Sequence, residues 1–267
     1  MQKTKWQCKI SPTLGGGFAG TPNKVWGTTD YKDLNKDTVF FGCYGLPDLM
    51  IIRSHKGRKA ILWAGTDVTY LINGYWLDDK GKFRLDPKVV GVYLNKTCEN
   101  WCENNLERDE LKSVGIEAKV CPSYLGNVKK IKPYQWKSGI PKAYISVSGD
   151  DFKAYGWTEI DEFAKNNPEV MIYCYGNRSE WKSVRPNVFV RGRVTQKQMD
   201  SEIKKMHIAL RFNKHDGFSE IVAKAVLMEQ NVISKIDYPF LKLGRKKARK
   251  WLLKNVNKFP WVSATKS

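Results

Sequence analysis

The sequence lacks the long apolar runs, clustered metal ligands and paired cysteines on which several protein classes depend. No apolar stretch approaches the roughly 20 residues that a membrane-spanning helix needs. Three histidines occur without metal-site spacing. Among the six cysteines only Cys98 and Cys102 lie close together, and a C-x3-C pair without histidine partners does not match a zinc site. We therefore expect reduced thiols, no metal and no integral membrane segment.

Acidic residues are scarce relative to basic ones. The chain of 267 residues has 27 Asp and Glu against 46 Lys and Arg, which gives a formal charge of +19. Such an excess attracts polyanions, either nucleic acid or the anionic surface of a membrane. A Lys-rich coding bias would produce the same excess without any partner. Because the start, from Met1 to Lys5, does not resemble a signal peptide, we expect a cytoplasmic protein.

Alternation of apolar runs with helical patterns predicts an α/β fold. Buried-strand runs at Thr38–Gly42 and Lys59–Ala64 flank a helix-compatible segment, Leu49–Ile52, which is the beginning of a parallel sheet. We expect a further strand at Val89–Leu94 and a helix over Cys98–Ser113. The polar, turn-rich segment 126–139 then predicts a linker.

The second half repeats the alternation more regularly and predicts a doubly wound sheet. The expected strands are 143–147, 170–175, 188–190, 208–211 and 232–234, and the expected helices are 157–166, 196–205 and 219–229. We thus expect a Rossmann-like N-terminal domain (1–137), a second Rossmann-like domain (138–240), and a basic helix and tail (241–267). The helix in this tail is expected to pack back toward the N-terminal domain.

The segment Ile208–Ser234 is the most informative part of the chain. A strand, a Gly-containing turn and a helix follow one another, which places free amides of a helix N-terminus where they can hold a phosphate. Asp216-Gly217-Phe218-Ser219, Ala225 and the strand at Asn231–Ser234 resemble the donor-binding motif of retaining, family-4-like GT-B glycosyltransferases. The order of elements is similar over residues 142–236.

This resemblance implies two Rossmann-like domains that face a cleft, and transfer of a sugar from a nucleotide sugar, a UDP-sugar, to a hydroxyl group. It implies a catalytic role for Asp216. Asp67 resembles the cleft residue of small GT-B enzymes and is the second catalytic candidate, either to orient the acceptor hydroxyl or to support the transition state. In the family a second Glu binds the donor ribose, but the matching residue here is Lys224, which cannot accept a hydrogen bond. Glu220, one turn earlier, is the candidate substitute.

Further candidates lie at predicted strand ends, around the helix start and in loops. Because fixed cations and amides can stabilise a leaving diphosphate, no metal or other cofactor is expected. Each candidate also has a structural interpretation, as a helix cap, an ion pair or a solvated charge. The donor-binding candidates are Arg211, Arg193, Lys153, Lys214, Gly217, Phe218, Ser219, Glu220 and Lys224. The acceptor-binding candidates are Gly16, Gly17, Lys129, Lys130 and Trp136.

The acceptor is suggested by charge and overall character. Short, strongly basic GT-B-like enzymes of some bacteriophages glycosylate hydroxymethylated DNA bases, and the similarity favours a DNA acceptor, reached through the basic surface in a host cytoplasm. Two alternatives stay open. One is a peripheral membrane glycosyltransferase acting on a lipid-linked or polysaccharide acceptor, and the other is a non-catalytic nucleic-acid-binding protein, for which Lys224 is the main argument. The sequence makes no prediction of oligomeric state.

Overall fold

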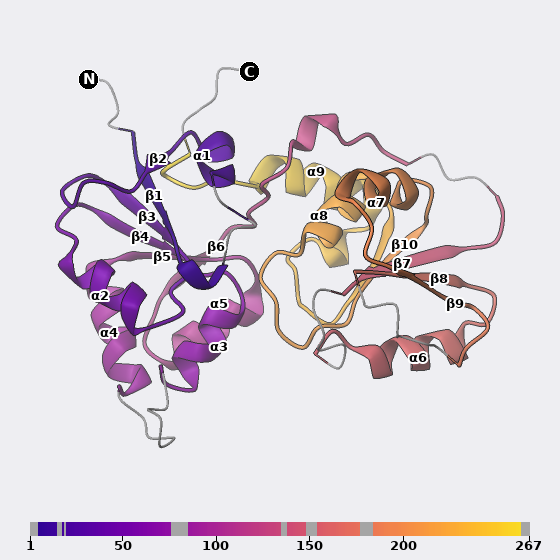
Figure 1. The fold of residues 1–267 in the computed structure, drawn as a ribbon, viewed down its shortest axis with the longest axis horizontal. Helices are drawn as coiled ribbons and strands as arrows, with labels where there is room; N and C mark the ends of the chain where they lie inside the picture. The colour runs from indigo at the N-terminus through magenta and orange to yellow at the C-terminus, as the bar shows by residue number, and fades with distance from the viewer. Residues whose placement is uncertain are drawn as a thin grey trace. The chain divides into compact units, whose positions relative to one another are not determined.

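The computed structural model consists of two units of parallel α/β structure (Figure 1). It describes residues 5–14, 18, 20–75, 85–134, 138–147, 154–176 and 184–262. The division at Asn127 and Val128 falls inside the segment 126–139 that we interpreted as a linker. The first unit comprises Met1–Asn127, Asp216–Phe218 and Asn255–Ser267, and the second comprises Val128–His215 and Ser219–Lys254.

The described residues of the first unit form a six-stranded parallel sheet in the order β2-β1-β3-β4-β5-β6. Its strands are β1 (Gln7–Ile10), β2 (Thr29–Asp30), β3 (Thr38–Phe41), β4 (Lys59–Leu62), β5 (Glu99–Cys102) and β6 (Ala118–Val120). Its helices are α1 (Thr21–Trp26), α2 (Leu46–Ser54), α3 (Thr66–Ile72), α4 (Pro87–Thr97) and α5 (Asn105–Ser113), with a 3-10 turn η1 (Pro12–Leu14).

Different segments of the chain cover the two faces of this sheet. Helices α2, α3, α4 and α5 lie on one face, where Phe40 of β3 joins their apolar residues (Figure 1). Side chains alternate along a strand, so the neighbouring Phe41 points to the opposite face. There it packs with Trp26 of α1 and with Phe259 and Trp261 from the C-terminal segment. The end of the chain therefore completes the core of the first unit.

The described residues of the second unit form a five-stranded parallel sheet in the order β11-β10-β7-β8-β9. Helix α6 covers one face, and α7 and α8 cover the other (Figure 1). The strands are β7 (Lys142–Ser146), β8 (Met171–Tyr175), β9 (Val188–Gly192), β10 (Ile208–Arg211) and β11 (Asn231–Ser234). The helices are α6 (Trp157–Asn166), α7 (Gln196–Ile203), α8 (Glu220–Leu227) and α9 (Arg245–Asn255), with 3-10 turns η3 (Val128–Lys130) and η4 (Leu241–Leu243).

The prediction of two Rossmann-like α/β parts is confirmed, and two local predictions were wrong. Val89–Leu94 lies inside α4, because Pro87 occupies the first turn and the Asp86 side chain caps the helix by accepting a hydrogen bond from Lys88 N at 2.7 Å. The stretch Cys98–Ser113 begins with β5, and its helix starts only after Asn104, whose side chain accepts from Glu107 N at 3.0 Å.

The C-terminal helix α9 belongs to the second unit up to Lys254, and the chain from Asn255, the last residue of the helix, belongs to the first. All six cysteines are free thiols. In the part of the chain that the structure describes, no helix combines the length and apolar character needed to cross a membrane.

Candidate active site

The order of strands in the second unit reverses between β7 and β10. These two strands are parallel neighbours, with Ile208 opposite Ala143 and Ala209 opposite Tyr144. Their carboxyl ends therefore lie side by side, while the connections from these ends lead to helices on opposite faces of the sheet. Ligands of doubly wound sheets bind at such a reversal, so this edge is the expected ligand site of the unit.

Arg211 is fixed at this edge. It is the last residue of β10, and its Nη1 donates to Ser146 O at the end of β7 over 3.2 Å. Its guanidinium carbon lies 5.5 Å from the ring centroid of Tyr155. Beside Tyr155, Gly156 has a φ of 79°, and a Cβ there would lie 2.4 Å from Cβ of Phe212. The close approach of Gly156 to Phe212 keeps Tyr155 beside the end of β10. The Arg211 guanidinium therefore lies between Ser146 O and the Tyr155 ring.

The loop after β10 contains a buried polar atom that no described residue satisfies. Asn213 is 7% exposed, and its Oδ1 accepts no hydrogen bond from the described part of the chain. A buried polar atom in that state costs about 1–3 kcal/mol, which a ligand or a water can recover. Ser219, at the start of α8, makes no side-chain cap, and its amide donates to Tyr238 Oη at 3.4 Å.

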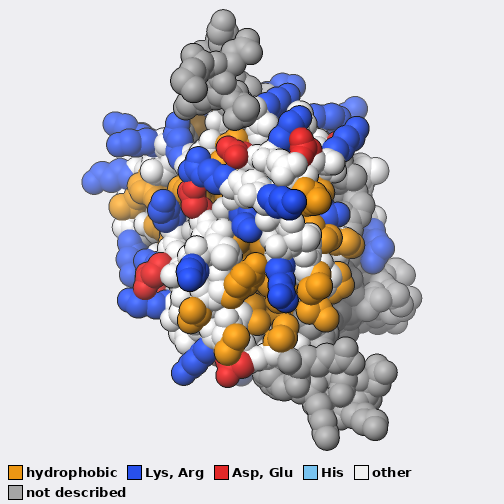
Figure 2. Space-filling view, turned by 90° about the vertical axis from the view of Figure 1, so that its left-hand side faces the viewer, with side chains coloured by type: hydrophobic (Ala, Val, Ile, Leu, Met, Phe, Trp, Pro, Cys, Tyr) orange, Lys and Arg blue, Asp and Glu red, His pale blue; other side chains and the backbone are white. Residues whose placement is uncertain are grey.

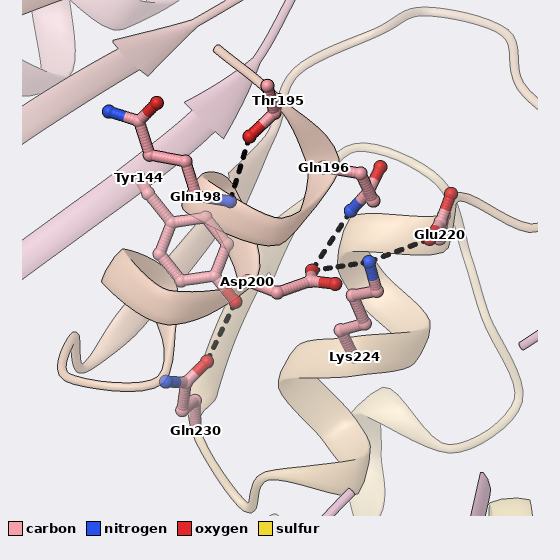
Figure 3. Close-up of polar contacts among 8 residues, drawn as sticks. All are labelled: Tyr144, Thr195, Gln196, Gln198, Asp200, Glu220, Lys224 and Gln230. Carbon is pink, nitrogen blue, oxygen red and sulfur yellow. Dashed lines mark hydrogen bonds and ion pairs between the residues drawn. The ribbon is translucent and has the colours of Figure 1, made fainter. Parts of the chain in front are cut away.

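Lys224 is a buried cation between two carboxylates (Figure 3). Its side chain is 10% exposed, and its Nζ lies 2.6 Å from Asp200 Oδ1 of α7 and 2.7 Å from Glu220 Oε1. Gln196 Nε2 also donates to Asp200 Oδ1 at 2.9 Å. Glu220 and Lys224 thus form an i,i+4 ion pair, one of the structural interpretations open to these candidates, whereas the contact with Asp200 was not predicted. Two carboxylates therefore flank Lys224, the residue at which the segment 208–234 differs from the donor-binding motif that it resembles.

A second set of contacts fixes α7, and Figure 3 draws one of them, the bond between Tyr144 and Gln230. Tyr144 Oη of β7 donates to Gln230 Oε1 at 2.7 Å. Gln230 Nε2 in turn donates to the carbonyl oxygens of Ile203 and Met206 at 2.8 and 2.7 Å, at the end of α7. Because both residues are buried, this chain of hydrogen bonds sets the position of α7 against the sheet, and with it the position of Asp200.

Asp67, in the first turn of α3, is fully buried and bonded to backbone. Its Oδ1 accepts from Ala64 N at 2.9 Å and from Val68 N at 3.0 Å, and its Oδ2 accepts from Cys43 N at 3.0 Å. The carboxylate thereby ties together the segments that follow β3 and β4. The role on an acceptor hydroxyl that we expected from the sequence stays a prediction.

The turn Asp216–Phe218 belongs to the first unit and contacts the residues that follow β5. Asn104 Nδ2 donates to Asp216 O at 2.8 Å and to Gly217 O at 3.4 Å. Glu103 Oε2 accepts from Phe218 N at 2.5 Å. Sequence reasoning missed Glu103 and Asn104, because the prediction of one long helix over 98–113 concealed the end of β5.

Carboxyl groups gather around this turn. Burial raises the pKa of Glu103 to about 7, and the negative charges of Asp216 and Asp67 add to the shift, while hydrogen bonds from Ser123 and Phe218 oppose it. Burial and the neighbouring Glu103 raise the pKa of Glu107 well above its ordinary value. Glu103 therefore titrates near neutral pH.

This shift predicts a pH-dependent stability. In the unfolded chain Glu103 loses its proton near the ordinary pKa of 4.5, and in the folded chain near 7. The contribution of this proton to the free energy of unfolding is therefore fully present below pH 4.5 and is lost as the pH rises to about 7. From about pH 5 to 7.5, the melting temperature of the wild type should fall relative to that of Glu103→Gln, which does not titrate. Melting temperatures are measured by scanning fluorimetry at each pH. If the melting temperatures of the two proteins change with pH in the same way, the raised pKa of Glu103 is contradicted.

The structure places the other sequence candidates as follows. Lys214 and Arg193 are exposed, and so are Lys129 and Lys130 in the second unit. Within the described ranges no group of three His, Cys, Asp or Glu side chains could hold a metal ion. Gly16, Gly17, Lys153 and Trp136 lie outside the described residues.

Comparison with known proteins shows the fold alone. No family model matches the sequence, and no curated protein is detectably similar. TarM has 15% identity and a TM-score of 0.52, with 83% of this chain and 48% of TarM covered. The pneumococcal O-GlcNAc transferase GtfA has 11% identity and a TM-score of 0.50, with 79% of this chain and 44% of GtfA covered. Sucrose-phosphate synthase from Thermosynechococcus elongatus has 10% identity and a TM-score of 0.52, with 74% of this chain and 55% of the synthase covered. The chain thus spans about half the length of these proteins, and its fold is of the GT-B type.

Proposed function

We propose that this protein is a glycosyltransferase that moves a sugar from a nucleotide-sugar donor, a UDP-sugar, to an acceptor hydroxyl. The observation that carries the proposal is the fixed Arg211 at the strand-order reversal of the second unit, in a fold of the GT-B type. The buried Oδ1 of Asn213, to which no described residue donates a hydrogen bond, supports a ligand at the same edge. GtfA was solved in complex with UDP and GlcNAc, and a variant of S. aureus TarM in complex with UDP, which favours a UDP-sugar donor.

In the proposed reaction, the bond between the anomeric carbon and the diphosphate oxygen breaks. The acceptor oxygen forms the new bond to that carbon, and the nucleoside diphosphate leaves with the bonding electrons and takes up the proton of the acceptor hydroxyl. Arg211 and the first amides of α8 stabilise the charge that develops on the diphosphate. With these groups in place, we propose that no metal is required. Asp216 acts beside the reacting sugar, and Asp200 and Glu220 provide the carboxylate acceptors that Lys224 lacks.

A donor panel tests the activity. The full chain is incubated with UDP- and GDP-sugars, with and without a chelator, and release of the nucleoside diphosphate is measured. We expect turnover of one UDP-sugar that the chelator does not change. No turnover of any nucleotide sugar would contradict the transferase, and loss of turnover with the chelator would contradict metal independence.

Arg211→Ala should lower kcat/KM for the donor about 10- to 100-fold, the usual effect of losing a hydrogen bond to a charged group. Arg53→Ala on α2 is the matched control, because Arg53 is also an arginine but lies exposed in the first unit. Steady-state kinetics of both variants provide the measurement. Equal kcat/KM values for the two variants would remove Arg211 from the donor site.

For the acceptor we propose DNA that contains hydroxymethylated bases, bound through a basic surface of the second unit. Arg249 of α9 donates to Leu227 O at 2.8 Å and to Ile131 O at 3.4 Å, which holds α9 against the segment 128–132. No Asp or Glu occurs from Tyr238 to Val262. The exposed cations of segments 128–132 and 238–254 of the second unit are Lys129, Lys130, Lys132, Lys242, Arg245, Lys246, Lys247, Lys250 and Lys254.

This basic surface suits a phosphate backbone more than insertion into lipid. Ala248 and Leu252 of α9 are buried, and although Leu253 is 37% exposed, most of the exposed side chains of the helix are cations. Basic residues also cover other parts of the molecule: on the face drawn in Figure 2, Lys and Arg side chains are widespread and Asp and Glu are few. A duplex would bind through this charge, and the target base would be flipped out for reaction.

Mass spectrometry of DNA tests the acceptor. Unmodified and hydroxymethylated duplexes are incubated with the enzyme and the active donor, and anionic vesicles are assayed for binding in parallel. We expect a gain of one sugar mass on the hydroxymethylated duplex alone. Donor hydrolysis without transfer to DNA, together with sedimentation on vesicles, would favour the peripheral membrane enzyme. Duplex binding without any donor turnover would favour the non-catalytic binding protein.

A further inference from the structure

The turn Asp216–Phe218 is held by side chains through its backbone. The carbonyl oxygens of Asp216 and Gly217 accept hydrogen bonds from Asn104 Nδ2 at 2.8 and 3.4 Å. The backbone amide of Phe218 donates to Glu103 Oε2 at 2.5 Å. None of these three bonds depends on the side chain of Asp216. The contacts therefore set the path of the backbone on both sides of the Asp216 side chain.

The fit between the turn and its surroundings is close. A Cβ on Gly217 would lie 2.2 Å from Glu103 Oε2 and 3.3 Å from the carbonyl carbon of Ala64. A Cβ on Gly65, whose φ is 102°, would lie 2.9 Å from Gly217 N. The turn thus lies against the segments that follow β4 and β5, at the carboxyl ends of two neighbouring strands. Glycine at both positions permits this approach.

Glu103 and Asn104 are themselves held by second contacts. Ser123 Oγ donates to Glu103 Oε1, and Asn104 Oδ1 accepts from Glu107 N at 3.0 Å as the cap of α5. Glu107 Oε2 in turn accepts from Glu103 N at 2.7 Å. Both residues are buried, so each presents its remaining polar atom to the turn in a fixed direction.

We propose that Glu103 and Asn104 are positioning residues for sugar transfer, which hold the Asp216–Phe218 turn so that the Asp216 carboxylate keeps one place. The inference rests on the proposed function, because it assigns these residues an effect on the transfer step through Asp216. Neither residue touches the substrate in this proposal. Their loss should therefore lower kcat and leave KM for the donor nearly unchanged.

Asn104→Ser separates this role from capping of α5. Serine is also a good cap, so the bond to Glu107 N and the stability of α5 are retained, whereas the amide that binds the turn is lost. We expect kcat to fall about 10-fold, since both hydrogen bonds from the amide to the turn are removed. The melting temperature should stay close to that of the wild type. An unchanged kcat would overturn the role of Asn104.

Glu103→Gln and Glu103→Ala form a matched pair. The amide of Gln can offer its oxygen to Phe218 N and its nitrogen to Ser123, whose hydroxyl accepts as well as donates. Ala offers neither. We therefore expect Glu103→Gln to keep most of the wild-type kcat at neutral pH and Glu103→Ala to lose about 10-fold. Equal kcat values for the two variants would overturn the role of Glu103.

Hydrogen exchange of the Phe218 amide gives a readout that needs no activity. Exchange should be about 10-fold faster in Glu103→Ala than in the wild type, while the amide of Cys121, which donates to Cys102 O at 2.8 Å in the same unit, should not change. If the wild type turns over no nucleotide sugar but its Phe218 amide exchanges more slowly than that of Glu103→Ala, the proposed function is contradicted and the contact between Glu103 and the turn is supported. An active enzyme whose Phe218 amide exchanges equally fast in both proteins would contradict the positioning role alone.

Discussion

Asp216→Asn should lower turnover of the nucleotide sugar about 10³-fold, the loss typical of removing a group that stabilises charge in a transition state. The substitution preserves the size of the side chain and removes its negative charge. The fold should survive, because the contacts of Asn104 with this turn are made to the Asp216 and Gly217 carbonyl oxygens. Donor turnover under saturating conditions and the melting temperature are the two measurements.

Asp109→Asn is the control for this prediction. Asp109 lies on α5, its side chain is 64% exposed, and it pairs with the neighbouring Arg108. The same chemical change there should leave turnover and melting temperature nearly as in the wild type, since exposed ion pairs contribute little. If Asp216→Asn behaves like Asp109→Asn, Asp216 is not a catalytic residue, and the match of the 208–234 segment to the donor-binding motif loses its main functional support.

Trp261→Ala should destabilise the protein by about 3–5 kcal/mol, the range for removing a large aromatic side chain from a core. Trp261 is 1% exposed and stacks on Phe259 with ring centroids 4.5 Å apart. Its ring also lies 6.2 Å from that of Trp26 and 5.9 Å from that of Trp101. Deleting it opens a cavity on one face of the first sheet. Chemical denaturation followed by tryptophan fluorescence and by circular dichroism measures the loss.

Val89→Ala tests whether the loss at Trp261 reflects burial. Val89 lies on α4 of the same unit and is 66% exposed, and alanine has the higher helix propensity. This variant should therefore stay within about 0.5 kcal/mol of the wild type. A Trp261→Ala protein as stable as Val89→Ala would mean that the C-terminal segment does not complete the core of the first unit.

Local patterns were sufficient for most of the fold. Helix α6 and strand β10 have the bounds that the sequence predicted, because apolar periodicity and the flanking turn residues act over a few positions. Prediction was wrong where two local signals overlapped. At 98–113 the charged helical spacing of α5 was extended over β5, and at 89–94 the valines outweighed the Asp-Pro cap of α4.

The candidate site divides in the same way. Arg211 could be predicted at a ligand edge, because a residue at the carboxyl end of a parallel strand must lie there whatever the rest of the chain does. Asp200 could not be predicted beside Lys224, since 24 positions separate them and the contact depends on how α7 and α8 pack on one face. Glu103 meets Phe218 across 115 positions.

By itself, then, the amino-acid sequence determined the alternation of strands and helices, the excess of positive charge and the turn that opens α8. Only the tertiary structure decided the order of the strands, the partners of Asp216–Phe218 and the burial of Trp261 at the far end of the chain. The reason is physical. Periodicity and capping are local properties of a backbone, whereas pairing between distant segments depends on which apolar faces bury each other and which buried polar atoms find partners.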